Sequence, residues 1–600
     1  MSVSWNAAER RKTWEQIDQL WDVLVIGGGI TGAGILREAS RVGLRVLLVE
    51  QRDFAWGTSS RSSKLVHGGL RYLKSGQVGL TRASVHGREQ LLVDGPGLVD
   101  PLGFLLADYE GDSPGRFVYG AGLTIYDLLA MQWSHKYYSP LDFQMMAPYI
   151  TPTGLRGGFH YQDAQTDDAR LVLRVIREAV AGGGTAINYI RAERLVRDES
   201  GSLVGVTLRN SVDGEFGPEK DVQARVIINA TGAWADELRG QLDLKKRIRP
   251  LRGSHLIFPA WRFPVAQAVS FMHPIDGRPV FAFPWEGITL VGTTDVDCPP
   301  PLDKDPSITP EEVAYLMAAV TTQFPALNLT LDDVVSTFAG IRPVIGSGKA
   351  APSDESRDHV IWHEDGLLTV TGGKLTTFRQ TARVVLEQIC EQLKQSGLDD
   401  STLLESLHDD VPILEQIDAE LPGGDYLDAD TQRRLVGRYG ADAAPLMASV
   451  DPDEMEFIPG TPFLWAELRW SARMEGVIHL DDLLLRRVRL GLLRADGGAE
   501  LLPAIGSICQ RELGWDEERW AREADSYMRL WKEAYYLPQR AAIPDWDDLL
   551  VEARMRQEEI TILRVERRKT QSRQALATLL LIFSLFILWR VWAKNKNRTA

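Results

Sequence analysis

Residues 22–50, DVLVIGGGITGAGILREASRVGLRVLLVE, are the segment that most constrains the fold. The apolar runs VLVI and VLLV are typical of strands covered on both faces, as in a parallel sheet joined by a right-handed helical crossover. Between them stands Gly27-x-Gly29-x-x-Gly32, whose glycines permit a tight turn, a close approach of backbone to pyrophosphate, and close helix–strand packing. Glu50 ends the second strand, where an acidic side chain accepts hydrogen bonds from ribose hydroxyls. Together these features predict a dinucleotide-binding unit.

Two further apolar strands recur far along the chain, VIINATGAW from Val226 and LLTVTGGKLTTF from Leu367, and both contain glycine turns. The motif near the N-terminus does not by itself distinguish FAD from NAD, but a long bound cofactor needs contacts from such scattered segments, which favours FAD. The sequence therefore predicts an α/β, discontinuous FAD-binding domain over residues 20–85, 165–235 and 336–400. We expect the intervening residues 86–164 and 236–335 to form a substrate-binding domain.

After residue 400 the pattern changes, because Leu and Val recur at three- and four-residue spacing, as is typical of helices. We expect a helical domain over residues 401–550 and a charged connector over residues 551–574. Residues 575–593 contain ALATLLLIFSLFILW, which is uncharged and apolar on every face. At ~1.5 Å per residue the run through Trp592 spans roughly 27 Å if Arg590 snorkels, which predicts a C-terminal transmembrane helix. A buried helix of a bundle is the alternative.

The distribution of charge and the number of cysteines indicate which binding partners and which cellular compartment to expect. The whole chain carries a net charge of −15, whereas residues 551–600 hold 11 Lys and Arg against 4 Asp and Glu. The acidic body argues against nucleic acid as a partner, and the basic tail favours anionic lipid. The three cysteines have no metal-ligand spacing, so no metal is expected. Because the N-terminus lacks a signal-peptide core, we expect a membrane-bound protein with its catalytic body on the cytoplasmic side of the plasma (inner) membrane.

Residues 57–73, GTSSRSSKLVHGGLRYL, crowd hydroxyl, glycine and basic residues into one segment, and RGSHLIFP, FAFPW, VGTTDV, GIRPV, TVTGGKLTTFR and LPGG follow in order. Over roughly residues 20–510 this series closely resembles the FAD-dependent glycerol-3-phosphate dehydrogenase family. The resemblance implies a Rossmann-like FAD-binding domain of the glutathione-reductase and amino-acid-oxidase type, a mixed-sheet substrate domain and a C-terminal helical domain. The apolar C-terminal segment differs from the bacterial members of this family, which are peripheral membrane proteins. The sequence also lacks the D-x-[DN]-x-[DN]-G loop of calcium-binding relatives.

The resemblance also implies which residues bind cofactor and substrate. For FAD, the matching positions are Gly27, Gly29, Gly32, Glu50, Thr58, Ser59, Lys64, His67, Gly68, Gly232, Gly373, Leu375 and Thr376. For a phosphorylated substrate, they are Arg71, Thr294, Arg342 and Lys374. Arginine forks and a lysine point charge suit a phosphate dianion, although each cation could instead be an ordinary surface residue.

The reaction implied is oxidation of sn-glycerol 3-phosphate at C2 to dihydroxyacetone phosphate, with a hydride passing to FAD and electrons passing on to membrane quinone. His255 is the favoured proton acceptor, because histidine can relay a proton near neutral pH. Arg342 and Lys374 complete the predicted catalytic set. A satisfied core histidine is the competing interpretation of His255, and His67 is the second candidate base.

Other assignments stay open at this point. Within VGTTDV, the residues Thr293, Thr294 and Asp295 either position the substrate or Arg342, or form a plain polar turn. Two alternative functions are an oxidase of the same fold, acting on an amine or amino acid or using oxygen, and a flavin-binding assembly subunit without turnover. The expected partners are glycerol 3-phosphate, membrane quinone and the lipid bilayer through the C-terminal helix. The oligomeric state, a homodimer included, is left open.

Overall fold

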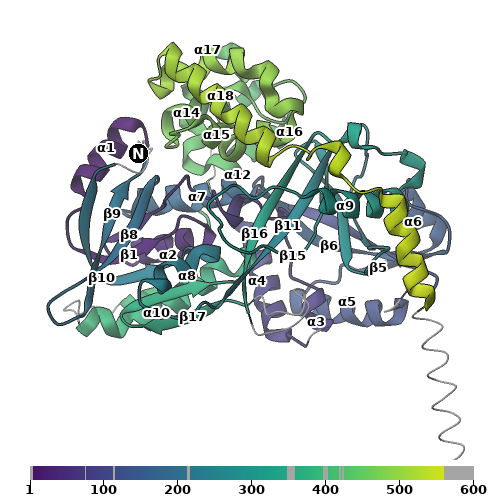
Figure 1. The fold of residues 1–600 in the computed structure, drawn as a ribbon, viewed down its shortest axis with the longest axis horizontal. Coiled ribbons are helices and arrows are strands. Elements are labelled where there is room, and N and C mark those ends of the chain that lie inside the picture. The colour runs from purple at the N-terminus through teal and green to yellow at the C-terminus, as the bar shows by residue number, and fades with distance from the viewer. Residues whose placement is uncertain are drawn as a thin grey trace, which may run out of the picture.

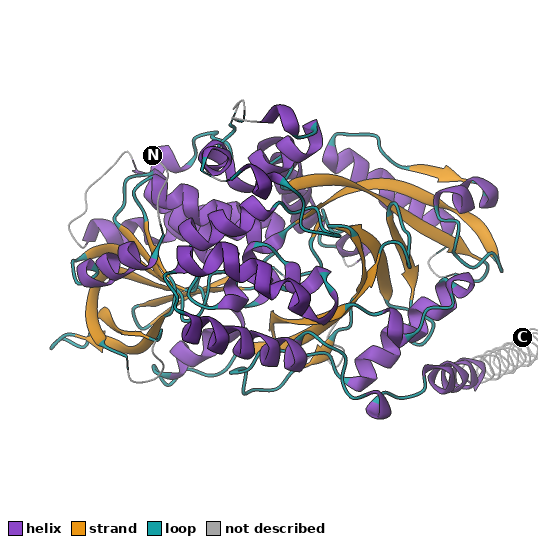
Figure 2. Cartoon of the chain, turned by 90° about the horizontal axis from the view of Figure 1, so that it is seen from above, coloured by secondary structure: helices purple, strands orange, loops and turns teal. Residues whose placement is uncertain are grey.

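The computed structural model describes residues 5–559 apart from residues 75, 113–114, 213–216, 347–357, 396–402, 418–420, 422–423 and 450. Figure 1 shows two sheets beside each other, with a group of helices from late in the chain lying above them. Seen from above, these helices cross the middle of the molecule (Figure 2). Each of the two sheets draws strands from widely separated parts of the sequence.

The first sheet has eight strands and a parallel centre, in the order β17-β18-β10-β1-β2-β7, and β8 and β9 extend it from β10. The bounds are β1 Trp21–Ile26, β2 Val46–Val49, β7 Thr185–Ile187, β8 Ile190–Arg197, β9 Leu203–Asn210, β10 Glu219–Asn229, β17 Val360–Glu364 and β18 Leu367–Thr371. In the register, Val25 pairs with Ile228 and Leu48, and Ile228 also pairs with Leu368. The four predicted apolar strands are therefore adjacent and parallel.

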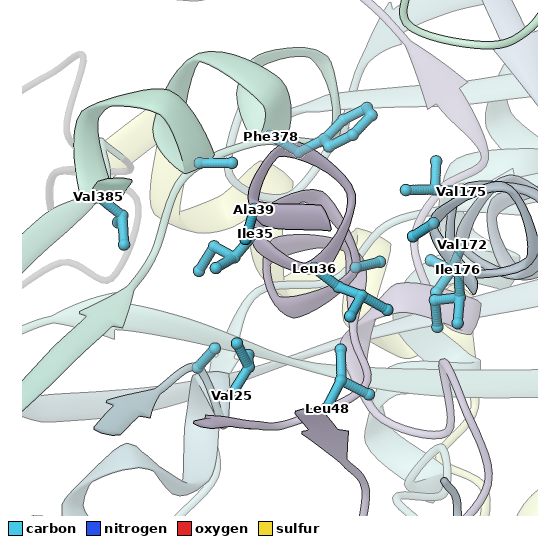
Figure 3. Packing of buried hydrophobic residues seen from close by; sticks show 14 of the residues in the cluster. Val25, Ile35, Leu36, Ala39, Leu48, Val172, Val175, Ile176, Phe378 and Val385 are labelled. Atoms are coloured by element: carbon cyan, nitrogen blue, oxygen red, sulfur yellow. The ribbon is translucent and has the colours of Figure 1, made fainter. Parts of the chain in front are cut away.

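Three helices pack against one face of this sheet, namely α2 (Ile30–Arg41), α7 (Asp168–Ala181) and α10 (Phe378–Gln395). Ile35, Leu36 and Ala39 share one face of α2 because they stand one helical turn apart or next to each other. Figure 3 shows them between Val25 and Leu48 of the strands and the side chains of the two flanking helices. Full burial of an Ile or Leu side chain contributes roughly 1.5–3 kcal/mol to the free energy of folding. The packing of these side chains therefore holds the start of α2 at the end of β1.

The second sheet has ten strands in the order β15-β11-β14-β13-β12-β4-β6-β3, with β16 paired to β11 and β5 paired to β6. The bounds are β3 Leu65–Val66, β4 Val99–Tyr109, β5 Lys136–Tyr138, β6 Leu155–Thr166, β11 Ile248–Pro259, β12 Ala268–Met272, β13 Pro279–Trp285, β14 Ile288–Gly292, β15 Val296–Asp297 and β16 Ser336–Ile345. Antiparallel pairing of β11 with β16 sets Phe338 opposite His255 and Arg342 opposite Leu251. One pair of long strands thus carries two of the predicted site residues.

Helices border this second sheet and form the C-terminal unit. Those of the middle of the chain are α3 Arg71–Lys74, α4 Val78–Asp94, α5 Arg116–Ala130, α6 Pro140–Met146, α8 Ala235–Gly240 and α9 Pro310–Gln323. The C-terminal ones are α12 Ala429–Tyr439, α13 Ala443–Ala448, α14 Trp465–Met474, α15 Leu480–Asp482, α16 Leu490–Leu493, α17 Leu502–Leu513 and α18 Glu517–Ala534, and a further helix covers residues 546–559. Between α15 and α16 lies η10 (Leu483–Arg487), a π-helical turn.

The predicted fold class needs one correction. Within residues 5–559, as far as the structure describes them, no helix is both long enough and apolar enough to cross a membrane. Charged residues interrupt the two longest described helices throughout, FRQTARVVLEQICEQLKQ of α10 and EERWAREADSYMRLWKEA of α18. The prediction of a transmembrane helix is therefore wrong for the described fold. The segment for which it was predicted, residues 575–593, lies outside the described residues.

His479 links the C-terminal helices to the first sheet and gives the fold a pH dependence. Its Nδ1 lies 3.1 Å from Glu523 Oε1, and its ring meets the ring of Tyr189 edge-on at 5.0 Å. Burial alone would lower the pKa of His479, but the hydrogen bond to Glu523 and the charge of Asp482 raise it to about 9. The folded state therefore holds a proton that the unfolded state releases above its own pKa of about 6.5.

We expect this stabilisation to be complete below pH ~6.5 and to disappear as the pH rises through about 9. The side chain is 34% exposed, so solvent screening limits the effect to no more than about 1 kcal/mol, or roughly 1–3 °C in Tm. Thermal unfolding of the wild type and of His479→Gln between pH 6 and 9.5 measures it. The wild-type Tm should fall more steeply across this range than that of the variant, and parallel curves would contradict the assignment.

Candidate functional site

The turn from β1 into α2 is shaped for close backbone contact. Gly27 has a φ of 117°, and a Cβ on it would lie 2.6 Å from the carbonyl oxygen of Ala230. A Cβ on Gly32 would lie 1.9 Å from the carbonyl oxygen of Gly27. The turn therefore tolerates no side chain at either position, and the first backbone N–H groups of α2 face the space where a pyrophosphate can bind.

A cavity of about 400 Å³ lies along the carboxyl ends of the parallel strands. Its lining includes Gly27, Gly29, Glu50, Thr58, Ser59, Ile190, Arg191, Glu193, Gly232, Trp234, Pro343, Gly373, Lys374 and Leu375. Ile190, Arg191 and Glu193 lie on β8, and Pro343 lies on β16. The others follow β2, β1, β10 and β18, four adjacent strands that span about 14 Å at ~4.8 Å per step. A cavity that crosses four strand ends fits an extended dinucleotide better than a mononucleotide.

Glu50 stands at one end of this cavity and is already oriented by the backbone. Its carboxylate accepts hydrogen bonds from Gly28 N–H at 2.7 Å and Arg52 N–H at 2.9 Å. Burial raises the pKa of Glu50, and the two backbone bonds oppose that rise. Two bonds leave carboxylate lone pairs for ribose hydroxyls, so the predicted role of Glu50 fits its geometry.

A loop over residues 53–64 closes the cavity from the side of the glycine turn. Ala55 N–H donates to the Gly28 carbonyl at 3.0 Å, and Ile30 N–H at the start of α2 donates to Ser59 Oγ at 3.0 Å. The Thr58 hydroxyl donates to the carbonyl of Ile341 on β16. The loop therefore touches the dinucleotide turn and the second sheet together.

Lys64 is the last residue of this loop, and its side chain is buried in the protein interior. It is fully buried, and its Nζ donates to the Ser60 carbonyl at 2.9 Å and to both carboxylate oxygens of Asp168 at 2.9 and 3.0 Å. Burial, with the nearby charge of Arg489, lowers the pKa of Lys64 to about 8 although Asp168 opposes the shift. Lys64 is not among the described residues that line the cavity, so it stabilises the loop without forming part of the cavity wall.

Lys374 lies at the other end of the cavity, in the turn between β18 and α10. Its Nζ donates to Ser84 Oγ of α4 at 2.8 Å and lies 3.6 Å from the centre of the Tyr72 ring. A Cβ on Gly69 would come within 3.1 Å of that Nζ. A glycine and an aromatic ring thus surround the ammonium group of Lys374, which lines this end of the cavity.

Arg342 is held in a fixed orientation beside this end of the cavity. Its guanidinium donates to Asp295 at 3.0 Å, to the Thr294 carbonyl at 3.2 Å and to Thr293 Oγ1 at 3.1 Å. A Cβ on Gly253 would lie 2.3 Å from its Nη2, so a glycine makes room for the planar group. The next residue, Pro343, lines the cavity. Asp295 therefore holds the guanidinium of Arg342, and the functional roles of both residues stay predictions.

His255 lies on β11 and is buried against β16 and the loop of residues 53–64. Its Nε2 lies 2.9 Å from Ser63 Oγ, and its ring stacks on Phe338 with centroids 4.4 Å apart. Burial, followed by the charges of Arg342 and Lys64, lowers its pKa well below the usual value, so the imidazole is neutral. Its Nδ1 is buried and has no hydrogen-bond partner among the described residues. A neutral ring with one uncommitted nitrogen is able to accept a proton.

The remaining predicted residues differ in how the structure presents them. The Thr294 hydroxyl accepts from Ser254 N–H at 2.8 Å and donates to Glu312 at 2.6 Å, so it braces β11 against α9. Gly68 packs on Tyr126, and Thr376 is buried with its Oγ1 unpartnered within the described chain. His67 follows β3 and is half-buried, and the side chain of Arg71 lies outside the described part of the structure. Their roles stay predictions.

Sequence reasoning missed several residues that the site brings together: Tyr72, Ser84, Ser63, Gly253, Asp168 and the segment from Ile190 to Glu193. Tyr72 stands next to Arg71 in the quoted segment, and Ser63 stands next to Lys64, so their neighbours were the available signals. Ser84 carries no local signal, because it lies on an ordinary helix 290 residues before its partner.

Comparison with known proteins agrees with this geometry. A family model described as FAD dependent oxidoreductase matches residues 22–387, and one described as the C-terminal domain of alpha-glycerophosphate oxidase matches residues 386–520. The aerobic glycerol-3-phosphate dehydrogenase of Staphylococcus epidermidis is 37% identical over 496 residues, which cover 78% of this chain and 87% of that protein. The chain belongs to this family. The corresponding Staphylococcus aureus enzyme is 36% identical over 486 residues, covering 78% of this chain and 86% of that protein.

A solved relative extends the likeness to three dimensions. The glycerol-3-phosphate dehydrogenase of Bacillus halodurans, complexed with FAD, superposes with a TM-score of 0.69 at 29% identity. The match covers 88% of this chain and 98% of that one. The predicted family, enzyme class and cofactor are thereby confirmed, because the aerobic glycerol-3-phosphate dehydrogenase family comprises FAD-dependent oxidoreductases. The cavity at the strand ends is the candidate FAD site.

Proposed function

We propose that this chain oxidises sn-glycerol 3-phosphate to dihydroxyacetone phosphate and passes the electrons to membrane quinone. The observation that carries the proposal is that Lys374 lines the FAD cavity, whereas Arg342 precedes the lining residue Pro343 and its charge helps to keep the buried His255 neutral. Two cations next to a flavin suit a substrate that carries a phosphate dianion, and the names of the Staphylococcus relatives support the same substrate.

The phosphate would be bound by the two cations with different geometry. Arg342 offers a planar fork already oriented by Asp295, whereas Lys374 offers a point charge held by Ser84. Asp295 also pairs with Arg278 at 3.1 Å, so its carboxylate is shared and leaves Arg342 with net positive charge for a ligand. Because these contacts exist without substrate, little ordering is required when the phosphate binds.

The chemical step needs a hydride and a proton to leave C2 and its hydroxyl together. FAD held by the glycine turn and Glu50 would supply the acceptor for the hydride as the C2–O bond becomes a carbonyl. His255 would accept the hydroxyl proton, because burial and the adjacent cations keep its imidazole unprotonated and therefore available to bind one. Ser63, 2.9 Å from its Nε2, fixes the orientation of the ring.

Quinone as acceptor implies that the enzyme works at a membrane surface, and we place it at the cytoplasmic face, where glycerol 3-phosphate is available. Exposed apolar side chains on and after α5 support this location. They include Phe117, Leu128, Met131 and Trp133, whose exposed fractions run from 65% to 91%. α5 lies along the lower edge of Figure 1, on the side away from α17 and α18. An apolar patch of this kind commonly marks an interaction surface.

Anaerobic bleaching of the flavin absorbance near ~450 nm tests the substrate assignment. We expect sn-glycerol 3-phosphate to bleach the holoenzyme, and glycerol and 2-phosphoglycerate to leave it yellow. Rapid re-oxidation by a soluble quinone, with little hydrogen peroxide formed in air, would support the acceptor. A flavin that none of the three compounds reduces would refute the substrate, and peroxide released in proportion to turnover would replace quinone with oxygen.

A further inference from the structure

Three buried arginines of the C-terminal unit reach into the FAD-binding domain. Arg486, Arg487 and Arg489 are each no more than 1% exposed. The first two end the π-helical turn η10, and Arg489 follows it with a φ of 59°. A π-helical turn and a left-handed arginine are both uncommon, and such features persist only where surrounding contacts determine them. What these side chains contact therefore indicates what the local geometry serves.

All three arginines bind the loop over residues 53–64 or the carboxylate that holds it. Arg487 donates two hydrogen bonds to Asp53, from Nη1 to Oδ2 at 2.6 Å and from Nη2 to Oδ1 at 2.8 Å. Arg486 Nε adds a third at 2.5 Å. Arg489 Nη2 donates to the Ser60 carbonyl and to Asp168 Oδ1, each at 2.9 Å. The loop is thus fixed at its beginning by Arg486 and Arg487 and near its end by Arg489.

The conformation of this loop needs such support. Ala55 and Lys64 hold φ values of 62° and 57°, which are unfavourable for residues with a Cβ. Between them, Trp56, Gly57, Thr58, Ser59 and Ser62 line the FAD cavity. Asp168 accepts hydrogen bonds from the N–H of Ser62 at 3.0 Å and from the hydroxyl of Ser62 at 2.7 Å. Asp168 thereby links Arg489 to a residue that lines the cavity.

No residue after Leu375 is among the described residues that line the cavity. The described residues of the C-terminal unit therefore do not line the cavity, and Arg489 reaches it through the loop and through Asp168, which is itself a lining residue. We propose that Arg487 and Arg489 are positioning residues for FAD, and that docking of the C-terminal helices holds the loop of residues 53–64 in its FAD-binding shape. This assigns to the C-terminal unit a part in cofactor retention.

Titration of deflavinated full-length protein with FAD tests this, with the dissociation constant read from flavin fluorescence and Tm recorded with and without FAD. Arg489→Met removes the donors to Ser60 and Asp168 while retaining most of the buried volume. We expect its FAD Kd to rise about ten- to hundredfold, because two bonds from a charged donor to buried acceptors are lost. Arg489→Lys keeps the charge without the fork and should lie between the variant and wild type.

Asp442→Asn is the matched control. Asp442 accepts from Arg177 Nε of α7 at 2.6 Å, which is another ion pair across the same interface but does not involve the loop. Its FAD Kd should stay within about twofold of wild type even where its Tm falls. A wild-type Kd in Arg489→Met and Arg489→Lys, or an equal rise in Asp442→Asn, would overturn the proposal. If Arg489→Met does not fold, the Arg489→Lys titration decides. FAD titration needs no substrate, so the result is independent of the proposed reaction.

Discussion

Arg342→Met is expected to lower kcat/KM for sn-glycerol 3-phosphate by about a thousandfold, equivalent to about 4 kcal/mol of transition-state binding. In the proposed function the guanidinium would donate a planar pair of charge-assisted bonds to the phosphate, and each such bond contributes roughly 1.5–3 kcal/mol. Its removal also leaves Asp295 with Arg278 as its remaining described arginine partner. Steady-state kinetics on variants with full FAD content measures the effect.

A control variant separates loss of the phosphate contact from general damage. Arg249→Met removes another arginine of the same sheet, one whose partner Asp297 is solvent-exposed at the edge of the site, and should change kcat/KM less than twofold. If Arg342→Met keeps kcat/KM within tenfold of wild type, Arg342 is not the phosphate ligand.

Much of the FAD-binding half could be predicted because its signals are local. The apolar runs at residues 22–50 define two strands and a crossover helix without reference to the rest of the chain. The strands that begin near Val226 and Leu367 could be joined to them because each is uniformly apolar and ends in glycine. The observed register, with Ile228 between Val25 and Leu368, confirms that inference.

The second sheet and the supports of the site could not be predicted in the same way. Whether His255 faces Ser63 or solvent depends on the pairing of β11 with β16, which joins residues about 80 positions apart. The bond from Ser84 to Lys374 and that from Arg489 to Ser60 depend on how whole domains dock. A serine on a helix or an arginine after a leucine-rich stretch looks the same in sequence whether it supports a site or faces water.

Gly32→Ala is expected to weaken FAD binding at least about a hundredfold, although it adds only one methyl group. The new Cβ would lie 1.9 Å from the Gly27 carbonyl oxygen, 3.1 Å from its carbon and 3.4 Å from Leu48 Cδ1. Backbone rather than a flexible side chain is the obstacle, so either α2 or the turn at Gly27 must shift. Gly27 cannot absorb the shift freely, since it has a φ of 117° and lies against Ala230.

A movement of even a few tenths of an ångström would displace the helix N–H groups from the pyrophosphate, and these fixed dipoles have no replacement elsewhere in the turn. Flavin content after purification and the FAD Kd of the refilled protein measure the loss. Gly79→Ala is the control, because Gly79 is an exposed helical glycine of α4 with open space around its missing Cβ, where alanine should be neutral or slightly stabilising. Equal flavin content in the two variants would mean that α2 can move without disturbing the cofactor, and that the close packing at Gly32 serves the fold alone.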